Sequence, residues 1–152
     1  MSLRRFNSPE RVRTFEHVPT NLGYDRLSTI EVDGKRHYVT PSGKHYPSIT
    51  TILSFEKNDA LENWKNRVGP VEASRVSRIA CSRGETFHLI AEKYLRNDSH
   101  FIEARDMPDC VAMFRAILPV LNRRIGRIYL QERPLYSDLL RVAGRTDLIA
   151  EF

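Results

Sequence analysis

The feature that most constrains this fold is a long helical pattern that begins at Pro70 and runs to about Asn97. Proline fits the first turn of a helix, because the N–H that it lacks would have no partner there. Small and aromatic residues recur at intervals of three and four along the segment, which predicts one tightly packed face. That face consists of Ala73, Val76, Ala80, Gly84, Phe87, Ala91 and Tyr94. The pattern predicts a core helix.

Shorter patterns on both sides of this helix predict a mixed α/β fold. Two β-prone runs, 28–32 and 36–40, flank Asp33-Gly34, a pair that suits the tight turn of a hairpin. A second turn is expected at 41–44. Further helices are expected over 52–55, 60–68 and 109–124, with Pro119 kinking or ending the last one. The β segments expected after them are 128–130, 135–136 and 139–152, and the last alternates so little that burial on both faces is expected.

The domain organisation follows from the same survey. Residues 1–27 hold prolines and a glycine without a sustained period and are interpreted as an arm, and residues 28–152 as a single domain. With 41% hydrophobic and 28% charged residues, the chain is neither a disordered tail nor a disulfide-stapled miniprotein. Because it has neither an apolar run of roughly 18 residues nor a signal peptide, we expect a soluble cytoplasmic protein, in the host cytoplasm if a phage encodes it. Cys81 and Cys110 are expected to be free, buried thiols.

Arginine dominates the positive charge. The chain has 24 Lys and Arg against 19 Asp and Glu, and 19 of the 24 are Arg, whose planar group suits phosphate. The excess is concentrated in residues 1–13 and 121–145. These segments contain Arg4, Arg5, Arg11 and Arg13, and Arg123, Arg124, Arg127, Arg133, Arg141 and Arg145. A polyanionic partner such as nucleic acid is one interpretation, and a solvated basic face is the other.

One helical histidine has carboxylates beside it. His88 lies four residues before Glu92 and three after Glu85, so the three share a face of the long helix. An imidazole and carboxylates can bind a divalent metal ion or act on a substrate, and the alternative is an ordinary set of ion pairs.

Asp147 stands within the last, otherwise apolar β segment. Removing a carboxylate from water is costly, so a buried Asp147 needs a partner. That partner is either a metal ion or an arginine, Arg145 or Arg141, and the remaining alternative is a simple acid at a strand edge.

Three hydroxyl residues precede the short helix expected over 52–55. They can hold a backbone phosphate or cap the helix, and capping is the preferred interpretation. The residues are Ser48, Thr50 and Thr51.

Several short motifs follow one another along residues 37–152. They are Tyr46-Pro-Ser-Ile-Thr-Thr-Ile-Leu53, Leu61-Glu-Asn-Trp64, Arg67-Val-Gly69, Arg83-Gly-Glu-Thr-Phe-His88, Glu92-Lys-Tyr-Leu95, Glu132-Arg-Pro-Leu-Tyr136 and Ala143-Gly-Arg-Thr-Asp-Leu-Ile149. In this order they resemble the PD-(D/E)XK nuclease superfamily, and within it phage-type exonucleases and the mitochondrial genome maintenance exonucleases. The specificity of the resemblance lies in the order of the motifs.

The resemblance implies a restriction-endonuclease-like α/β core in which helices pack on a mixed β-sheet. It implies a metal-dependent DNA exonuclease that hydrolyses phosphodiester bonds in phage replication, recombination or host DNA breakdown. His88 and Asp147 would bind magnesium or manganese, with Glu92 supporting the catalytic site. The metal would polarise the phosphate and lower the pKa of the attacking water. The residues implied to contact DNA, at its ends or as single strands, are Ser48, Thr50, Thr51, Arg83 and Arg145.

The family's acid-x-lysine motif would follow Phe152, so the resemblance identifies these residues as the N-terminal part of such a nuclease, incomplete at its C-terminus. We therefore expect that these 152 residues alone do not hydrolyse DNA at a normal rate. One alternative is a non-catalytic nucleic-acid-binding module. Another is one subunit of a split nuclease, completed by a second chain or an oligomer through an unfinished sheet edge.

Overall fold

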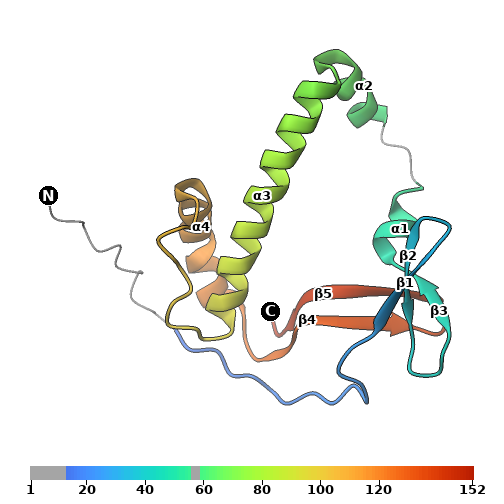
Figure 1. The fold of residues 1–152 in the computed structure, drawn as a ribbon. Helices are drawn as coiled ribbons and strands as arrows, with labels where there is room; N and C mark the ends of the chain where they lie inside the picture. Colours follow the sequence, from blue (N-terminus) through green and yellow to red (C-terminus); the bar gives the residue numbers. More distant parts are fainter. Residues whose placement is uncertain (1–12, 56–58) are drawn as a thin grey trace, which may run out of the picture. The chain divides into compact units, whose positions relative to one another are not determined.

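The computed structural model describes residues 13–55 and 59–152, and within them the fold is mixed α/β (Figure 1). Of the basic N-terminal cluster, Arg4, Arg5 and Arg11 lie outside the described residues. No helix of the described part has both the length and the apolar composition that a membrane crossing requires. The elements are β1 (Ser28–Val32), β2 (Lys35–Val39), β3 (His45–Pro47), α1 (Ile49–Leu53), α2 (Asp59–Val68), α3 (Pro70–Leu95), α4 (Pro108–Arg124), β4 (Ile128–Ser137) and β5 (Val142–Ala150).

The chain divides into two compact units, each assembled from separate stretches of sequence. The first unit contains the described part of Met1–His17, together with Trp64–Ile128 and Ala150–Phe152. The second unit contains the described parts of Val18–Asn63, together with Tyr129–Ile149. The single domain expected over 28–152 stays a prediction.

The core of the first unit is built around Tyr94, which is fully buried near the end of α3. Its ring packs edge-on against three aromatic rings, from Phe101, Phe114 and Phe15, at centroid distances of 5.0, 5.4 and 5.6 Å. The Tyr94 hydroxyl donates a hydrogen bond of 2.6 Å to Asn122 Oδ1 at the end of α4. These contacts join α3 to α4, which lies beside the C-terminal half of α3 in Figure 1.

The end of α3 is fixed by Asn97, which adopts a left-handed conformation with φ of 64°. The Asn97 N–H donates to the Tyr94 carbonyl and the Asp98 N–H to the Lys93 carbonyl, which together form a Schellman motif. The Asn97 side chain also exchanges hydrogen bonds of 2.9 and 2.8 Å with the backbone N–H and carbonyl of Phe15. The segment at 13–17 is therefore attached to the first unit through this cap.

The expected long helix is confirmed in its extent, but its predicted face is only partly packed. Ala73 and Tyr94 are buried, whereas Ala80 and Gly84 are exposed, and a Cβ at Gly84 would meet nothing within 4 Å. The prediction is wrong for the middle of α3, because α4 covers the side of α3 that carries Ile90 and Tyr94.

One other prediction for the first unit is corrected. Cys81 is exposed on α3, and only Cys110 is buried, so one of the two expected buried thiols is not buried. Of the two alternatives for Pro119, the end of the helix is excluded, since α4 continues to Arg124.

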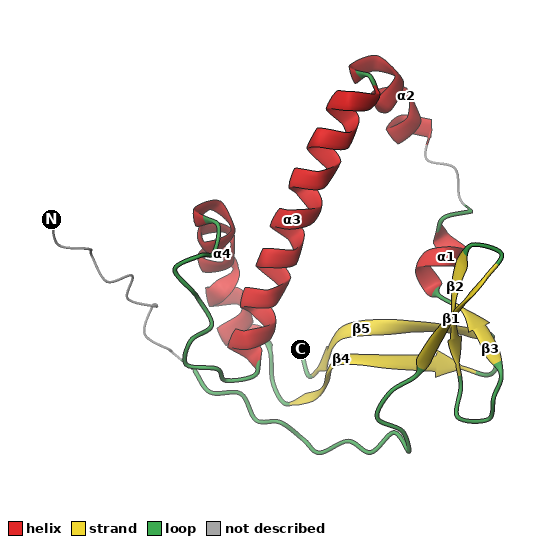
Figure 2. Cartoon of the chain, viewed as in Figure 1, coloured by secondary structure: helices red, strands yellow, loops and turns green. Residues whose placement is uncertain are grey.

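The second unit opens with the predicted hairpin. β1 and β2 pair antiparallel from Ser28 with Val39 to Val32 with Lys35. Asp33 and Gly34 have φ values of 50° and 70°, the positive values that a primed two-residue turn requires. β3 adds to the other edge of β2 and completes a three-stranded antiparallel sheet (Figure 2).

β4 and β5 form a separate two-stranded sheet, and the expected single mixed sheet is not formed among the described residues. β4 is one continuous strand where two short segments were expected, and it passes through Glu132 at a φ of 55°. β5 alternates between half-buried and exposed residues, so the predicted burial on both faces is wrong. A parallel bridge between Ser48 and Ala143 links β5 to the segment that begins α1.

The core of the second unit consists largely of tyrosines. Tyr38, Tyr46 and Leu27 pack with Ala143 around it, and Tyr24 and Tyr136 lie against this cluster half-buried.

Candidate functional site

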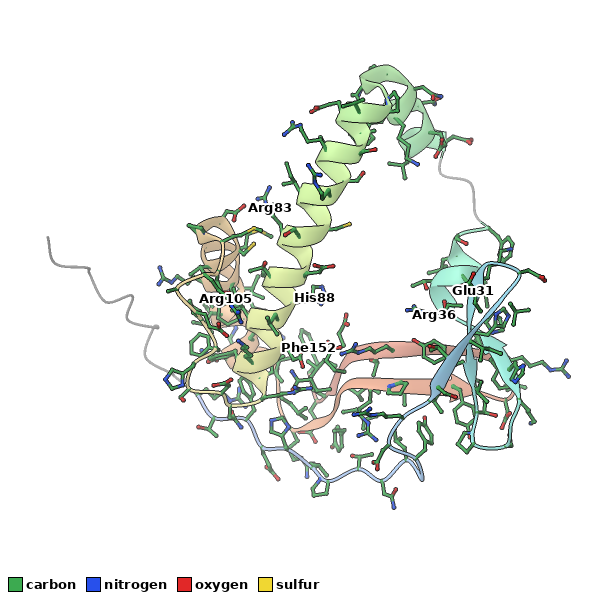
Figure 3. The ribbon with its side chains drawn as sticks, in the orientation of Figure 1. Glu31, Arg36, Arg83, His88, Arg105 and Phe152 are labelled. Atoms are coloured by element: carbon green, nitrogen blue, oxygen red, sulfur yellow. The ribbon has the colours of Figure 1, made fainter. Side chains whose placement is uncertain are left out.

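His88 lies on α3, in the first unit (Figure 3), and Glu92 belongs to the same helix. The His88 side chain is exposed. The Glu92 side chain is 18% exposed, and its Oε1 lies 2.8 Å from Arg96 Nη2, one turn further along the helix. An ordinary ion pair, one of the alternatives for this face, is therefore formed by Glu92.

Asp147 lies on β5, in the second unit, and it is exposed. The alternative of a buried acid is wrong, because β5 belongs to a two-stranded sheet with one open face, and Arg145, Asp147 and Ile149 are its exposed positions. Arg145, one of the partners expected for Asp147, instead forms an ion pair of 2.6 Å with Glu132.

The donors assigned to the metal are of suitable type, but no complete metal site is formed. Imidazole and carboxylate groups suit manganese, and carboxylate oxygens suit magnesium. Within the described ranges, no three His, Cys, Asp or Glu side chains come together in a way that could hold a metal ion.

The three hydroxyl residues at the start of α1 form a hydrogen-bonded network. Ser48 is buried and is the N-cap of α1, where its Oγ accepts a hydrogen bond of 3.1 Å from the Thr51 N–H. The same Oγ lies 2.7 Å from Thr50 Oγ1 and 2.9 Å from Thr51 Oγ1, and both threonines lie within the first turn of α1. The capping interpretation is confirmed for Ser48, and phosphate binding by these residues stays a prediction.

Arg83, on α3 (Figure 3), has a partner on α4. Its Nε lies 2.7 Å from Asp109 Oδ2, and both side chains are nearly half exposed. The Arg83 carbonyl also accepts a hydrogen bond from the Cys110 thiol, whose pKa is raised by burial. Arg83 therefore helps to join α3 to α4, and DNA contact by its guanidinium stays a prediction.

Sequence reasoning missed a polar hollow in the second unit, of about 540 Å³. It is lined by Asp25, Arg26, Tyr38, Glu132, Arg133 and Arg145, among others. Of the arginines, only Arg145 was assigned to nucleic acid. No local sequence pattern could have indicated this hollow. It forms because β4 continues through Glu132 in a left-handed conformation, and nothing in the Glu132-Arg133-Pro134 run predicts that conformation.

A second missed group surrounds Asp138, at the turn between β4 and β5. Asp138 Oδ1 accepts hydrogen bonds of 2.5 Å from the Tyr46 hydroxyl and 2.9 Å from Lys44 Nζ. The bond from Tyr46, followed by that from Lys44, lowers the pKa of Asp138, and the same bonds raise the pKa of Tyr46 and of Lys44. Because more than 90 residues separate the partners along the chain, no short motif indicates this contact.

Comparison of the chain with protein-family models, with curated proteins and with solved structures finds no match. The assignment of function therefore depends on the residues and geometry described above.

Proposed function

We propose that this chain belongs to a metal-dependent DNA exonuclease of the PD-(D/E)XK type, with a restriction-endonuclease-like core. The observation that carries the proposal is the ordered set of motifs from Tyr46 to Ile149, with His88 on a helix and Asp147 on a strand. Those are the two kinds of element on which the resemblance places these residues. Both side chains are exposed, so a metal ion can reach them from solvent.

In this proposal His88 Nδ1 or Nε2 and an Asp147 carboxylate oxygen are ligands of magnesium or manganese. The bound metal would polarise the phosphate and make a bound water more acidic. Glu92 keeps Arg96 beside the same face of α3, and so supports the site through the 2.8 Å pair rather than as a ligand. The arginines offer donors to the phosphate oxygens of DNA.

Cleavage of end-labelled DNA tests the proposal. Two forms of the protein are assayed: the 152 residues alone, and the 152 residues with any residues that the gene encodes after Phe152. Each form is assayed once with magnesium and once with EDTA. We expect nucleotide release that requires magnesium in the extended form, with a loss of at least 100-fold in His88→Ala and in Asp147→Ala. The matched control is His100→Ala, an exposed loop histidine outside every motif, which should keep full activity. Equal activity in His88→Ala and His100→Ala would contradict the assignment of His88.

A non-catalytic nucleic-acid-binding module is the second candidate. It is favoured by the arginine-lined hollow of the second unit. Such a module would bind DNA equally well in EDTA and magnesium, with an affinity that falls steeply with salt, and it would cleave DNA under neither condition.

A further inference from the structure

We propose that the polar hollow of the second unit binds the phosphodiester backbone of DNA. In the absence of DNA, Glu132 forms an ion pair with Arg145, and a bound phosphate displaces it. This inference rests on the proposed function and deepens it, because it assigns the surface that receives the nucleic acid. The volume of about 540 Å³ falls within the roughly 300–1,000 Å³ that is usual for ligand sites.

The charges in the hollow favour an anion. Arg26, Arg133 and Arg145 contribute three guanidinium groups, against the carboxylates of Asp25 and Glu132. Arg26 is exposed and forms no ion pair within the described stretches of the chain. A phosphodiester carries one negative charge and accepts hydrogen bonds from two guanidinium nitrogens at once. The lining therefore leaves one net positive charge that a phosphate can neutralise.

Arg133 is held in position by the backbone. Its Nη2 donates a hydrogen bond of 3.0 Å to the Tyr24 carbonyl and lies 3.7 Å from Asp25 Oδ1. Its Nε is buried and meets no hydrogen-bond acceptor in the described part of the chain. A carbonyl neutralises no charge, and the Asp25 side chain is fully exposed. The Arg133 cation thus remains only partly compensated, which keeps the potential in the hollow positive.

The arginine of the pair between Arg145 and Glu132 is free to turn. Arg145 uses Nε to contact Glu132 Oε2 at 2.6 Å, and its side chain is 60% exposed. Because the guanidinium is largely in solvent, it can turn from the carboxylate toward a phosphate. Glu132 itself is only 13% exposed. It therefore stays beside the hollow and competes with the incoming phosphate for Arg145.

The backbone at Glu132 supports the same conclusion. A glutamate at a φ of 55° within a strand is uncommon, because its side chain crowds the backbone in the left-handed region. Strain of this kind persists where the surrounding structure holds it, and it is concentrated at functional sites.

Binding of a fluorescein-labelled single-stranded oligodeoxynucleotide, measured by anisotropy in EDTA over a range of salt concentrations, tests the proposal. EDTA separates this surface from any metal-dependent step. We expect Arg26→Ala and Arg145→Ala each to weaken binding about tenfold and to reduce the slope of log K against log salt by about 0.7, the value for one phosphate contact on a single strand. Glu132→Gln should strengthen binding about threefold, because it removes the competing charge and keeps the shape of the side chain.

The chain offers a matched pair of controls on α3. Glu72 and Arg75 form an exposed ion pair of 2.6 Å, with the same residue types as Glu132 and Arg145. Arg75→Ala and Glu72→Gln change the net charge equally and should each alter binding less than twofold. Circular dichroism of every variant checks that the fold is kept.

Three results would overturn the proposal. If Arg145→Ala binds as tightly as Arg75→Ala, the hollow is not the binding surface, while DNA binding elsewhere on the chain leaves the proposed function standing. If Glu132→Gln weakens binding, Glu132 is not a competitor. If the unsubstituted chain binds no DNA in either EDTA or magnesium, the hollow and the proposed function fail together.

Discussion

The two units of this chain use aromatic residues in different ways. In the first unit, the Tyr94 ring packs against phenylalanine rings, and its hydroxyl donates a hydrogen bond to the Asn122 side chain. In the second unit, the tyrosine rings pack together, and their hydroxyls donate hydrogen bonds to groups outside the cluster. Tyr24 donates to the Pro134 carbonyl, and Tyr46 donates to the Asp138 carboxylate. The first unit is thus stabilised mainly by apolar burial, and the second depends more on polar contacts near solvent.

This difference explains how charged side chains are held in place at the surface of the second unit. A core built from tyrosines ends in hydroxyls, and these can hold charged side chains such as Asp138 in place at the surface. A core of phenylalanines offers no such groups. We therefore expect substitutions in the first unit to change stability most, and substitutions in the second to change pH and salt dependence.

The largest expected effect comes from Phe114→Ala. Phe114 is fully buried between Tyr94 and Phe101, so its truncation leaves a cavity that the helices can fill only in part. We expect a loss of about 3–5 kcal/mol in the free energy of unfolding. Native-state hydrogen exchange measures it for each unit separately. Faster exchange at Ile90 with unchanged exchange at Tyr38 is expected, whereas an equal change at both would contradict two distinct cores.

Tyr94→Phe should cost less, because it keeps the ring and removes only the hydroxyl. The lost bond of 2.6 Å leaves Asn122 Oδ1 without this donor in a half-buried position, which costs about 1–2 kcal/mol. Urea unfolding followed by fluorescence gives the value. A cost as large as that of Phe114→Ala would mean that the hydroxyl, and not ring packing, holds the first unit together.

Ser48→Ala removes the N-cap of α1 in the second unit and should cost about 1 kcal/mol. Ser48→Thr keeps the hydroxyl and is the matched control. Thermal unfolding compares the two variants with the unsubstituted chain. If the alanine variant is as stable as the threonine variant, the closed hydroxyl network contributes no stability.

The smallest expected effect is the pH dependence that arises from Asp138. The pKa of Asp138 is lowered in the folded state, first by the hydrogen bond from Tyr46 and then by that from Lys44. Its contribution to stability is therefore present above the unfolded-state pKa of about 3.9 and is lost as the pH falls through the lower folded-state value. Tyr46→Phe should raise the Asp138 pKa toward its ordinary value. A ¹³C NMR titration of the Asp138 carboxyl tests this, and an unchanged pKa would contradict the assigned cause.

Local patterns predicted the elements well where the local sequence determines the structure. The primed turn at Asp33-Gly34, the cap at Ser48 and the start of the long helix at Pro70 each depend on the conformational preferences of one or two residues. The same patterns failed where distant segments decide the outcome. The middle of α3 has the spacing of a packed face but is exposed at Ala80 and Gly84, because spacing fixes a face and not the element that covers it.

The candidate site shows the same limit. The sequence placed His88 on a helix and Asp147 on a strand, as the structure has them, but it left open whether Asp147 is buried, and the structure shows that it is exposed. The pair between Arg145 and Glu132 was not predicted, because it requires β4 to continue through a left-handed glutamate. Helix and strand periodicity carries no information about such a residue.

The proposed function requires that His88 and Asp147 bind the same metal ion. The most direct test is titration of the ¹⁵N-labelled 152-residue chain with Mn²⁺, because this paramagnetic ion broadens the amide signals of residues close to it. The proposal predicts that signals around His88 and around Asp147 broaden together at substoichiometric Mn²⁺, and that either His88→Ala or Asp147→Ala removes the broadening at both places. Broadening at one residue only, or broadening around Asp147 that persists in His88→Ala, would contradict it.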